Sequence, residues 1–219
     1  LGDKANEARI LNTIAHNYFN EKIYKKAVLY YEQVIGLYDE NNSVMLAASY
    51  EMAGLSYYNL QLDSVSSLRY SAAATFYERA GDNAGLLRCQ EKMGILYSHL
   101  GNYDQARKEY DNMITAYARD NDYKNLAMAN SQIGILRFRK SDLNGALESF
   151  TQAIELSEKG GSDDFFLTEA WSNKAICWQN LGNETEMLSS FKKSLEYAKS
   201  SGRSDEAARI ERIMAMVYY

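Results

Sequence analysis

The sequence predicts an all-α fold that is built as a solenoid of repeated helix pairs. Two observations lead to this prediction: the 219 residues include no proline, and a pattern of small and aromatic residues recurs about every 40 residues. Average usage of about 5% would place roughly eleven prolines in such a chain, and helix interiors tolerate proline least. The missing proline therefore favours long helices, and 46% hydrophobic residues are sufficient for a buried core.

The repeat is defined by a small residue that stands three positions before a bulky one. A second landmark follows twelve residues after the small residue, and an aromatic side chain comes four residues later in five units. Such a period is the signature of a repeat architecture. The small and bulky pairs are Ala15/Tyr18, Gly54/Tyr57, Gly94/Tyr97, Gly134/Arg137, Ala175/Trp178 and Ala215/Tyr218; the second landmarks are Ala27, Ser66, Ala106, Ala146 and Met187; the aromatic residues are Tyr31, Tyr70, Tyr110, Phe150 and Phe191.

Each unit has two apolar stripes at helical spacing around a short polar turn, which predicts a helix, a turn and a second helix. Segments rich in Asp, Asn, Gly and Ser separate the units, and these residues end one helix and cap the next. No unit can bury its stripe alone, so neighbouring units are expected to stack. The turns are expected at 20–22, 61–63, 101–102, 140–142 and 182–183, and the boundaries between units at 39–42, 81–83, 120–122, 160–164 and 200–205. The repeats are expected at 5–42, 43–82, 83–122, 123–162 and 163–202. They form one predicted domain, 1–219, which ends in a partial sixth repeat or capping helix at 203–219.

These residues resemble the tetratricopeptide repeat family, in which a small residue is followed by tyrosine, alanine and an aromatic residue at fixed positions. The third unit matches this pattern with Gly94, Tyr97, Ala106 and Tyr110. The resemblance covers essentially the whole chain, although the usual proline is absent and the period exceeds the common one of about 34 residues. It implies a right-handed α-solenoid, a superhelix whose first helices line a concave groove. Repeats of this length are similar to those of peptide-sensing bacterial regulators (the Rap phosphatase group), transcription activators of the maltose type and GoLoco-binding adaptors.

The resemblance also implies which residues face the groove. An aliphatic line would bind an extended peptide or a partner helix, and asparagine side chains would bond the ligand backbone. That the aliphatic line instead packs against neighbouring repeats is an open alternative. The residues expected to bind a peptide or protein are Asn12, His16, Phe19, Asn20, Glu51, Leu55, Tyr58, Asn59, Arg88, Lys92, Ile95, His99, Ile135, Phe138, Arg139, Ser172 and Ile176.

The carboxylate clamp of the family, which holds the acidic C-termini of chaperones, is incomplete in this chain. Arg88 and Lys92 occupy two of its positions, but the two preceding units do not supply the others. Chaperone docking is therefore disfavoured. Two uses remain for these cations: together with Arg139 they bind one carboxylate or phosphate, or they form ion pairs with Glu51 and Glu91.

The sequence favours a protein that is not an enzyme and needs no cofactor or metal. Cys89 and Cys177 lie 88 residues apart, only two histidines exist, and zinc-ligand spacing, glycine-rich phosphate loops and nucleophile motifs are missing. Both cysteines are expected to be buried without a disulfide. The net charge of −5 is spread along the chain, which disfavours nucleic acid, and no apolar run is long enough for membrane insertion.

Three functions stay open. The first is a non-catalytic module that binds a protein or peptide. The second is the sensor region of a larger bacterial signalling protein, such as a histidine kinase, a DNA-binding regulator or a Rap-like peptide receptor. The third is a scaffold that forms oligomers through the apolar C-terminal helix. Because the chain begins with Leu1, the compartment is also open: cytoplasmic, or periplasmic after removal of an upstream signal peptide.

Overall fold

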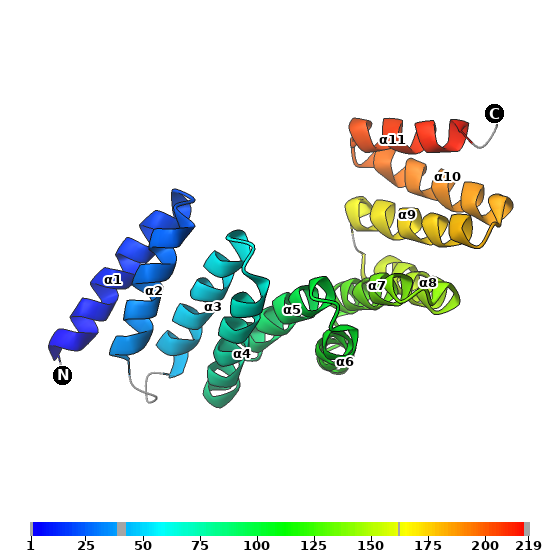
Figure 1. The fold of residues 1–219 in the computed structure, drawn as a ribbon. Coiled ribbons are helices and arrows are strands. Elements are labelled where there is room, and N and C mark those ends of the chain that lie inside the picture. Colours follow the sequence, from blue (N-terminus) through cyan, green and yellow to red (C-terminus); the bar gives the residue numbers. More distant parts are fainter. Residues whose placement is uncertain (1, 39–42, 162, 217–219) are drawn as a thin grey trace. The chain divides into compact units, whose positions relative to one another are not determined.

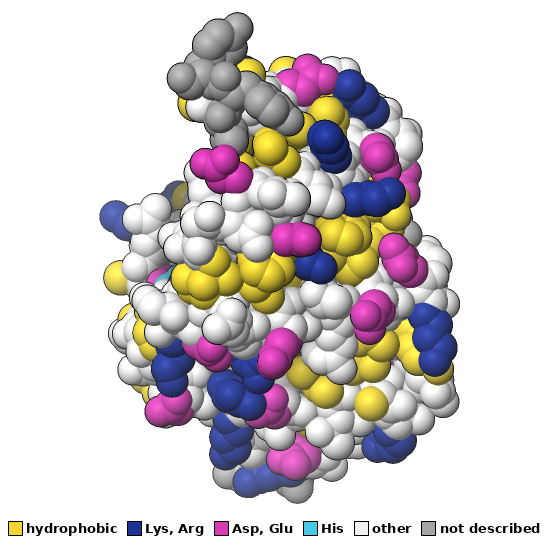
Figure 2. All heavy atoms as spheres, turned by 90° about the vertical axis from the view of Figure 1, so that its right-hand side faces the viewer, with side chains coloured by type: hydrophobic (Ala, Val, Ile, Leu, Met, Phe, Trp, Pro, Cys, Tyr) yellow, Lys and Arg dark blue, Asp and Glu magenta, His cyan; other side chains and the backbone are white. Residues whose placement is uncertain are grey.

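The chain is helical throughout the residues that the structure, a computed structural model, describes: 2–38, 43–161 and 163–216. These residues form eleven α-helices and no strand (Figure 1), which confirms the all-α prediction. Within them, no helix combines the length and the apolar character that a bilayer span requires. On the face shown in Figure 2, basic and acidic side chains are intermingled, with hydrophobic side chains between them.

The contacts divide the predicted single domain into two compact units, and each is described by itself. The first unit covers Leu1–Glu109 and the second Tyr110–Tyr219. Such a division is natural for stacked repeats, because each repeat contacts only its neighbours and no core is shared by the whole chain.

In the first unit, each of the first five helices packs against the helix that follows or precedes it in the sequence. The helices pair as the repeat pattern predicts, with a short turn inside each pair. They are α1 (Gly2–Asn20), α2 (Tyr24–Leu37), α3 (Ser43–Asn59), α4 (Asp63–Ala80), α5 (Asn83–His99) and the first residues of α6 (Tyr103–Arg119).

The second unit continues the same arrangement, and α7 also contacts α9, the first helix of the next repeat. Its last helix, α11, follows α10 as the first helix of a sixth repeat. The helices after α6 are α7 (Tyr123–Arg139), α8 (Leu143–Gly160), α9 (Asp164–Asn180), α10 (Glu184–Ser200) and α11 (Ser204–Ala215).

The small residues of the repeat allow two helices to cross closely. A Cβ added to Gly54 would lie 3.0 Å from the ring of Tyr70, and one added to Gly134 would lie 2.7 Å from the ring of Phe150. Any larger residue at Gly134 would displace the ring, which is 1% exposed. The aromatic landmarks are thus core side chains, as the sequence predicts: Tyr31, Tyr70, Tyr110, Phe150 and Phe191 are all buried.

The helix pairs are joined by turns with one residue in the left-handed region. This residue stands seven positions after the small landmark, and in three repeats it is not glycine: φ is 61° at Lys22, 59° at Gln61 and 62° at Ser141. The other two repeats use Gly101 and Gly182. Left-handed residues end helices, and glycine adopts this conformation without steric cost. The boundaries between repeats use the same device at Gly81, Asn121, Gly161 and Gly202.

Acidic and amide side chains begin five helices: three of them lie at the boundaries between repeats, as the composition there predicts, and two lie in the turns within repeats. In each case a side-chain oxygen accepts a hydrogen bond from the backbone N–H three residues later. Helices α2, α4 and α11 instead begin at Ile23, Leu62 and Arg203 without a side-chain cap. The first predicted boundary, 39–42, lies outside the described residues. The capping residues are Asp82, Asp122, Asp142, Asp163 and Asn183.

Both cysteines are buried and form no disulfide, as predicted. Burial raises the pKa of the Cys89 thiol to about 12 and that of Cys177 to about 11. Each therefore behaves as a small apolar core residue.

The predicted apolar end of the chain is only partly described. Met216 is 78% exposed, whereas Met214 packs against the core of the last helices. Residues 217–219, which include the predicted landmark Tyr218, lie outside the described residues. Self-association through this end stays a prediction.

Candidate functional site

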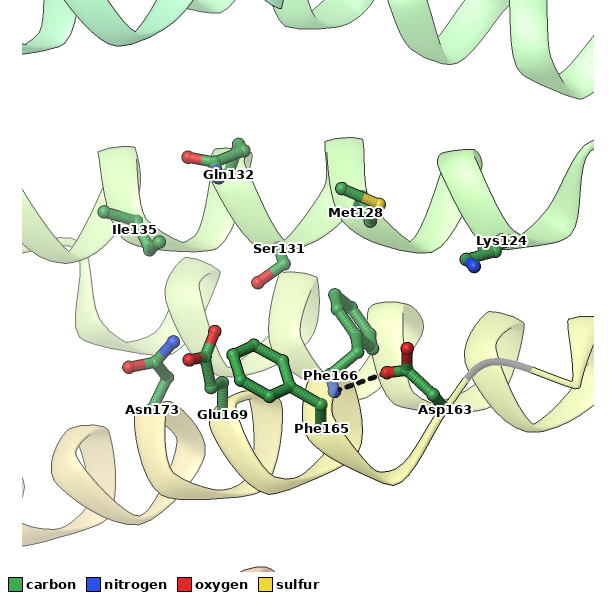
Figure 3. A pocket seen from close by; sticks show the side chains of 10 residues that line it. All are labelled: Lys124, Met128, Ser131, Gln132, Ile135, Asp163, Phe165, Phe166, Glu169 and Asn173. Carbon is green, nitrogen blue, oxygen red and sulfur yellow. Dashed lines mark hydrogen bonds between the residues drawn. The ribbon is translucent and has the colours of Figure 1, made fainter. Parts of the chain in front are cut away.

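A groove lies between α7 and α9, the first helices of the fourth and fifth repeats. Its hollow has a volume of about 380 Å³. In Figure 3 the lining side chains come from α7 on one side and from α9 and the residue before it on the other. The lining residues are Lys124, Met128, Ser131, Gln132, Ile135, Asp163, Phe165, Phe166, Glu169 and Asn173.

Large apolar side chains form the walls of this groove. Phe165 of α9 is 50% exposed and Met128 of α7 is 43% exposed. A second hollow of about 200 Å³ continues past Ile135 to Phe138 and Ile176. Exposed apolar surface inside a concave site is typical of binding grooves.

Two amide side chains, Gln132 and Asn173, line the same groove. Neither forms a hydrogen bond with any described residue. The nearby Asn180 behaves differently, because its Nδ2 donates to the carbonyl oxygen of Ile176 at 2.8 Å. The groove amides therefore keep their donors and acceptors available to a ligand.

The charged lining residues have distinct positions. Asp163 Oδ1 accepts a hydrogen bond from the backbone N–H of Phe166 at 3.0 Å and so caps α9. Lys124 lies opposite Asp163 at one end of the groove (Figure 3). Glu169 lies further along α9, with Arg203 Nη2 at 3.9 Å from its Oε1. The Arg203 guanidinium also covers the ring of Phe165, at 4.0 Å from the ring centre.

Comparisons with known proteins identify the repeats. A family model described as tetratricopeptide repeat matches residues 85–159, and a second model of the same description matches residues 8–41. The chain carries tetratricopeptide repeats. Such repeats indicate a module that binds proteins or peptides. No curated protein matches the chain.

Solved structures share the fold of these tetratricopeptide repeats. The apo form of RapI is 17% identical with a TM-score of 0.82, over 97% of this chain and 78% of RapI. Aspartyl phosphate phosphatase F from Bacillus subtilis is 15% identical with a TM-score of 0.80, over 95% of this chain and 55% of the phosphatase. The apo form of the quorum sensor NprR from B. thuringiensis is 14% identical with a TM-score of 0.74, over 96% of this chain and 59% of NprR. At these identities the likeness shows the fold.

The repeats of the first unit hold their predicted site residues in contacts with each other. Glu51 accepts hydrogen bonds from Arg88 Nε at 3.0 Å and Nη2 at 3.1 Å, and from the hydroxyl of Tyr77 at 2.5 Å. Burial, followed by this bond to Glu51, raises the pKa of Tyr77. The ion pair predicted as the alternative use of Arg88 is therefore present.

Other predicted residues of the first unit also have partners within the chain. Lys92 Nζ lies 3.4 Å from Glu91 Oε1, and His99 Nδ1 lies 3.7 Å from Asp63 Oδ2. The Asn59 side chain donates to the backbone of its own helix. The predicted role of asparagines in bonding a ligand is thus not favoured at Asn59. Two further contacts are those of His16 Nδ1 with the hydroxyl of Tyr31 and of Phe19 with the ring of Tyr24.

The predicted residues of the second unit lie partly in the groove. Ile135 lines the groove, and Phe138 and Ile176 line the second hollow next to it, which leaves their binding role as a prediction. The expectation that Ser172 faces a ligand is wrong, because this serine is 4% exposed and its hydroxyl shares a hydrogen bond of 2.8 Å with Ser194 Oγ on α10. The corresponding helix face packs onto the partner helix of the same repeat.

Of the groove residues that sequence reasoning missed, five bear on the groove's chemistry, and four of these five had a signal. The predicted binding residues Arg88 and Lys92 stand at two positions of the third repeat. The same two positions are held by Met128 and Gln132 in the fourth repeat and by Glu169 and Asn173 in the fifth, so the pattern could have indicated these four residues. The fifth, Phe165, stands in the extra first turn of a lengthened helix, for which the common pattern has no position. These five residues are Met128, Gln132, Phe165, Glu169 and Asn173.

Proposed function

We propose that this chain is a non-catalytic module that binds an extended peptide segment of a partner protein in the groove between α7 and α9. One observation carries the proposal: the unbonded amides of Gln132 and Asn173 stand beside the exposed side chains of Met128 and Phe165. Amide groups donate and accept hydrogen bonds, so they match the N–H and C=O groups of a peptide backbone.

The size of the groove suits one or two side chains of such a segment. Its volume of about 380 Å³ stands at the lower end of the roughly 300–1,000 Å³ that ligand pockets span. An apolar side chain placed between Phe165 and Met128 would remove apolar surface from water on both walls, which supplies affinity. The amides would then set the direction of the backbone.

The titratable groups of the groove support a role without catalysis. Asp163 is used as a helix cap, and no histidine or cysteine is among the lining residues. The second lining carboxylate, Asp163, is used to cap α9, and the hydroxyl of Ser131, which also lines the groove, has no lining histidine to activate it.

The test begins with a selection of displayed random nine-residue peptides on the full chain. The double variant Gln132→Ala/Asn173→Ala is expected to bind the selected peptides at least about fivefold more weakly, because each lost hydrogen bond contributes about 0.5–1.5 kcal/mol. The variant should keep its melting temperature, since neither amide bonds another described residue.

Asn180→Ala is the matched control. It removes an amide of the same helix that already bonds its own backbone, so peptide affinity should stay unchanged. Equal binding by the double variant and the wild type would overturn the proposed groove.

A second candidate function is the sensor region of a larger regulator. The observation that favours it is the likeness to NprR, described as a quorum sensor, over 96% of this chain and only 59% of NprR. Sequencing the open reading frame on both sides of the chain tests it: a further signalling domain supports this role, and an immediate start and stop codon would contradict it.

A further inference from the structure

The groove has an anionic group in the middle of one wall. Glu169 stands four residues after Phe165 and four before Asn173, so the three side chains share one face of α9. Figure 3 shows Glu169 close to Asn173, with Phe165 on its other side. The opposite wall on α7 presents Met128 and Gln132, which carry no charge.

The carboxylate of Glu169 is only weakly paired. Its side chain is 54% exposed, and the nearest described cation, Arg203, is 3.9 Å away. That distance is too long for a hydrogen bond. The guanidinium of Arg203 instead lies over the ring of Phe165. Glu51 in the first unit is the contrast, because its carboxylate accepts three hydrogen bonds.

We propose that the segment bound in this groove carries a bulky apolar residue and, two positions along, a lysine or arginine that pairs with Glu169. This inference rests on the proposed peptide-binding function. Four residues of helix separate Phe165 from Glu169 by about 6 Å, and two residues of extended peptide span about 6.6 Å with both side chains on the same face. The separation of Phe165 and Glu169 therefore matches a peptide with an apolar residue, then any residue, then a lysine or arginine.

The same charges disfavour a free C-terminal carboxylate as the anchor. In the carboxylate clamp two cations hold that group, but the corresponding positions here are Met128, Gln132, Glu169 and Asn173. Glu169 would repel a carboxylate placed beside it. The single lining cation, Lys124, lies at the far end of the groove, opposite Asp163 (Figure 3). The segment that fits is internal to its protein.

The experiment uses two libraries of random nine-residue peptides, one flanked by protein on both sides and one ending in a free carboxylate. Selection on the full chain should enrich the predicted spacing in the first library. Fluorescence anisotropy then measures the dissociation constant of a selected peptide. Glu169→Gln should weaken binding about two- to fivefold, as expected for a partly exposed ion pair. Charge reversal in Glu169→Lys should weaken it about tenfold or more.

A charge swap shows whether the contact is direct. The selected peptide with glutamate in place of its lysine should bind Glu169→Lys better than it binds the wild type. Glu158→Lys, which makes the same charge change at an exposed position of α8, is the control and should leave the dissociation constant unchanged. Thermal unfolding followed by circular dichroism separates a lost contact from a lost fold.

Two other results have different meanings. The first is a set of peptides that need Gln132 and Asn173 for binding but that lack a basic residue, bind Glu169→Lys as well as the wild type, or require a free carboxylate. This result would overturn the inference about Glu169 and leave the proposed function standing. Peptides that bind equally well without the two amides would overturn the proposed function, and this inference with it.

Discussion

Two equivalent places in the repeats, one in each unit, differ in whether the space between neighbouring first helices is filled. Between α3 and α5, Glu51 accepts hydrogen bonds from Arg88 and Tyr77. At the same repeat positions between α7 and α9 stand Ser131 and Glu169, and a groove remains. The same backbone pattern thus produces a closed contact in one unit and an open groove in the other.

The aromatic side chain beside the contact of Glu51 with Arg88 also stands on a different helix in the two units. Tyr77 of α4 corresponds to Ser157 of α8, and Gly85 of α5 corresponds to Phe166 of α9. A Cβ added to Gly85 would lie 2.5 Å from the ring of Tyr77, so the large and small residues exchange places between the repeats. The exchange keeps the helices packed but removes the hydroxyl that bonds Glu51, and the Ser157 hydroxyl is buried without a partner. The groove therefore lies where neighbouring side chains no longer satisfy each other.

The largest expected effect comes from the aromatic core residue beneath each place. Phe150→Ala should cost about 3–5 kcal/mol of unfolding free energy, because a buried aromatic ring is lost. Tyr70→Ala should cost a similar amount in the first unit. Urea unfolding followed by circular dichroism measures both losses. Peptide binding should fail only in Phe150→Ala; equal failure in both variants would contradict the assignment of the groove to the second unit.

Alkaline pH should separate the two units. Burial raises the pKa of Tyr31, Tyr70 and Tyr77 in the first unit, so the folded state keeps protons that the unfolded state releases above pH about 10. Their stabilisation is complete below that pH and is lost above it. Each buried tyrosine should cost about 1 kcal/mol one pH unit higher. Of the three buried aromatic landmarks in the second unit, Phe150 and Phe191 have no hydroxyl to ionise and only Tyr110 has one, so the effect should be smaller there.

The two tryptophans, Trp171 and Trp178, both lie in the second unit and report on it separately. In urea at alkaline pH, circular dichroism should show unfolding before tryptophan fluorescence changes. In Tyr31→Phe/Tyr70→Phe the gap should narrow. Coincident transitions in the wild type at pH above 10 would be evidence against this difference.

Replacement by alanine of the residue at this repeat position, Glu51 or Ser131, should affect the stability of the two units unequally. Glu51→Ala leaves the buried hydroxyl of Tyr77 and the Arg88 guanidinium without their shared acceptor, so a loss of about 1–2 kcal/mol is expected. Ser131→Ala at the same repeat position should change stability by less than about 0.5 kcal/mol. Thermal unfolding of both variants provides the comparison, and equal losses would mean that the ion pair does not stabilise the first unit.

The smallest effect concerns the turns. Ser141→Gly should stabilise the second unit by about 0.5–1 kcal/mol, because φ at Ser141 is 62° and glycine adopts it without strain. The control is Gly182→Ala at the equivalent turn, which should destabilise by about the same amount. A melting temperature that falls in Ser141→Gly would show that the serine hydroxyl contributes more than the strain costs.

The repeat pattern predicted the helices and the core closely. The aromatic landmarks and the small landmarks of the first five units are buried, and three boundary residues and two turn residues cap helices. The left-handed turn residues were not predictable as such, because Lys22, Gln61 and Ser141 do not favour that conformation. The site was predicted less well: Ile135 lies in the groove and Phe138 and Ile176 line the hollow next to it, whereas Ser172 is buried.

The sequence by itself determined the period, the helix pairs and the buried aromatic positions, because close packing demands the same residue types at the same places in every repeat. Only the tertiary structure decided where the surface is closed and where it is open. The reason is that Glu51 meets Arg88, and Ser131 faces Glu169, across residues about 40 positions apart. Whether such side chains satisfy each other depends on their contact after stacking, which no single repeat contains.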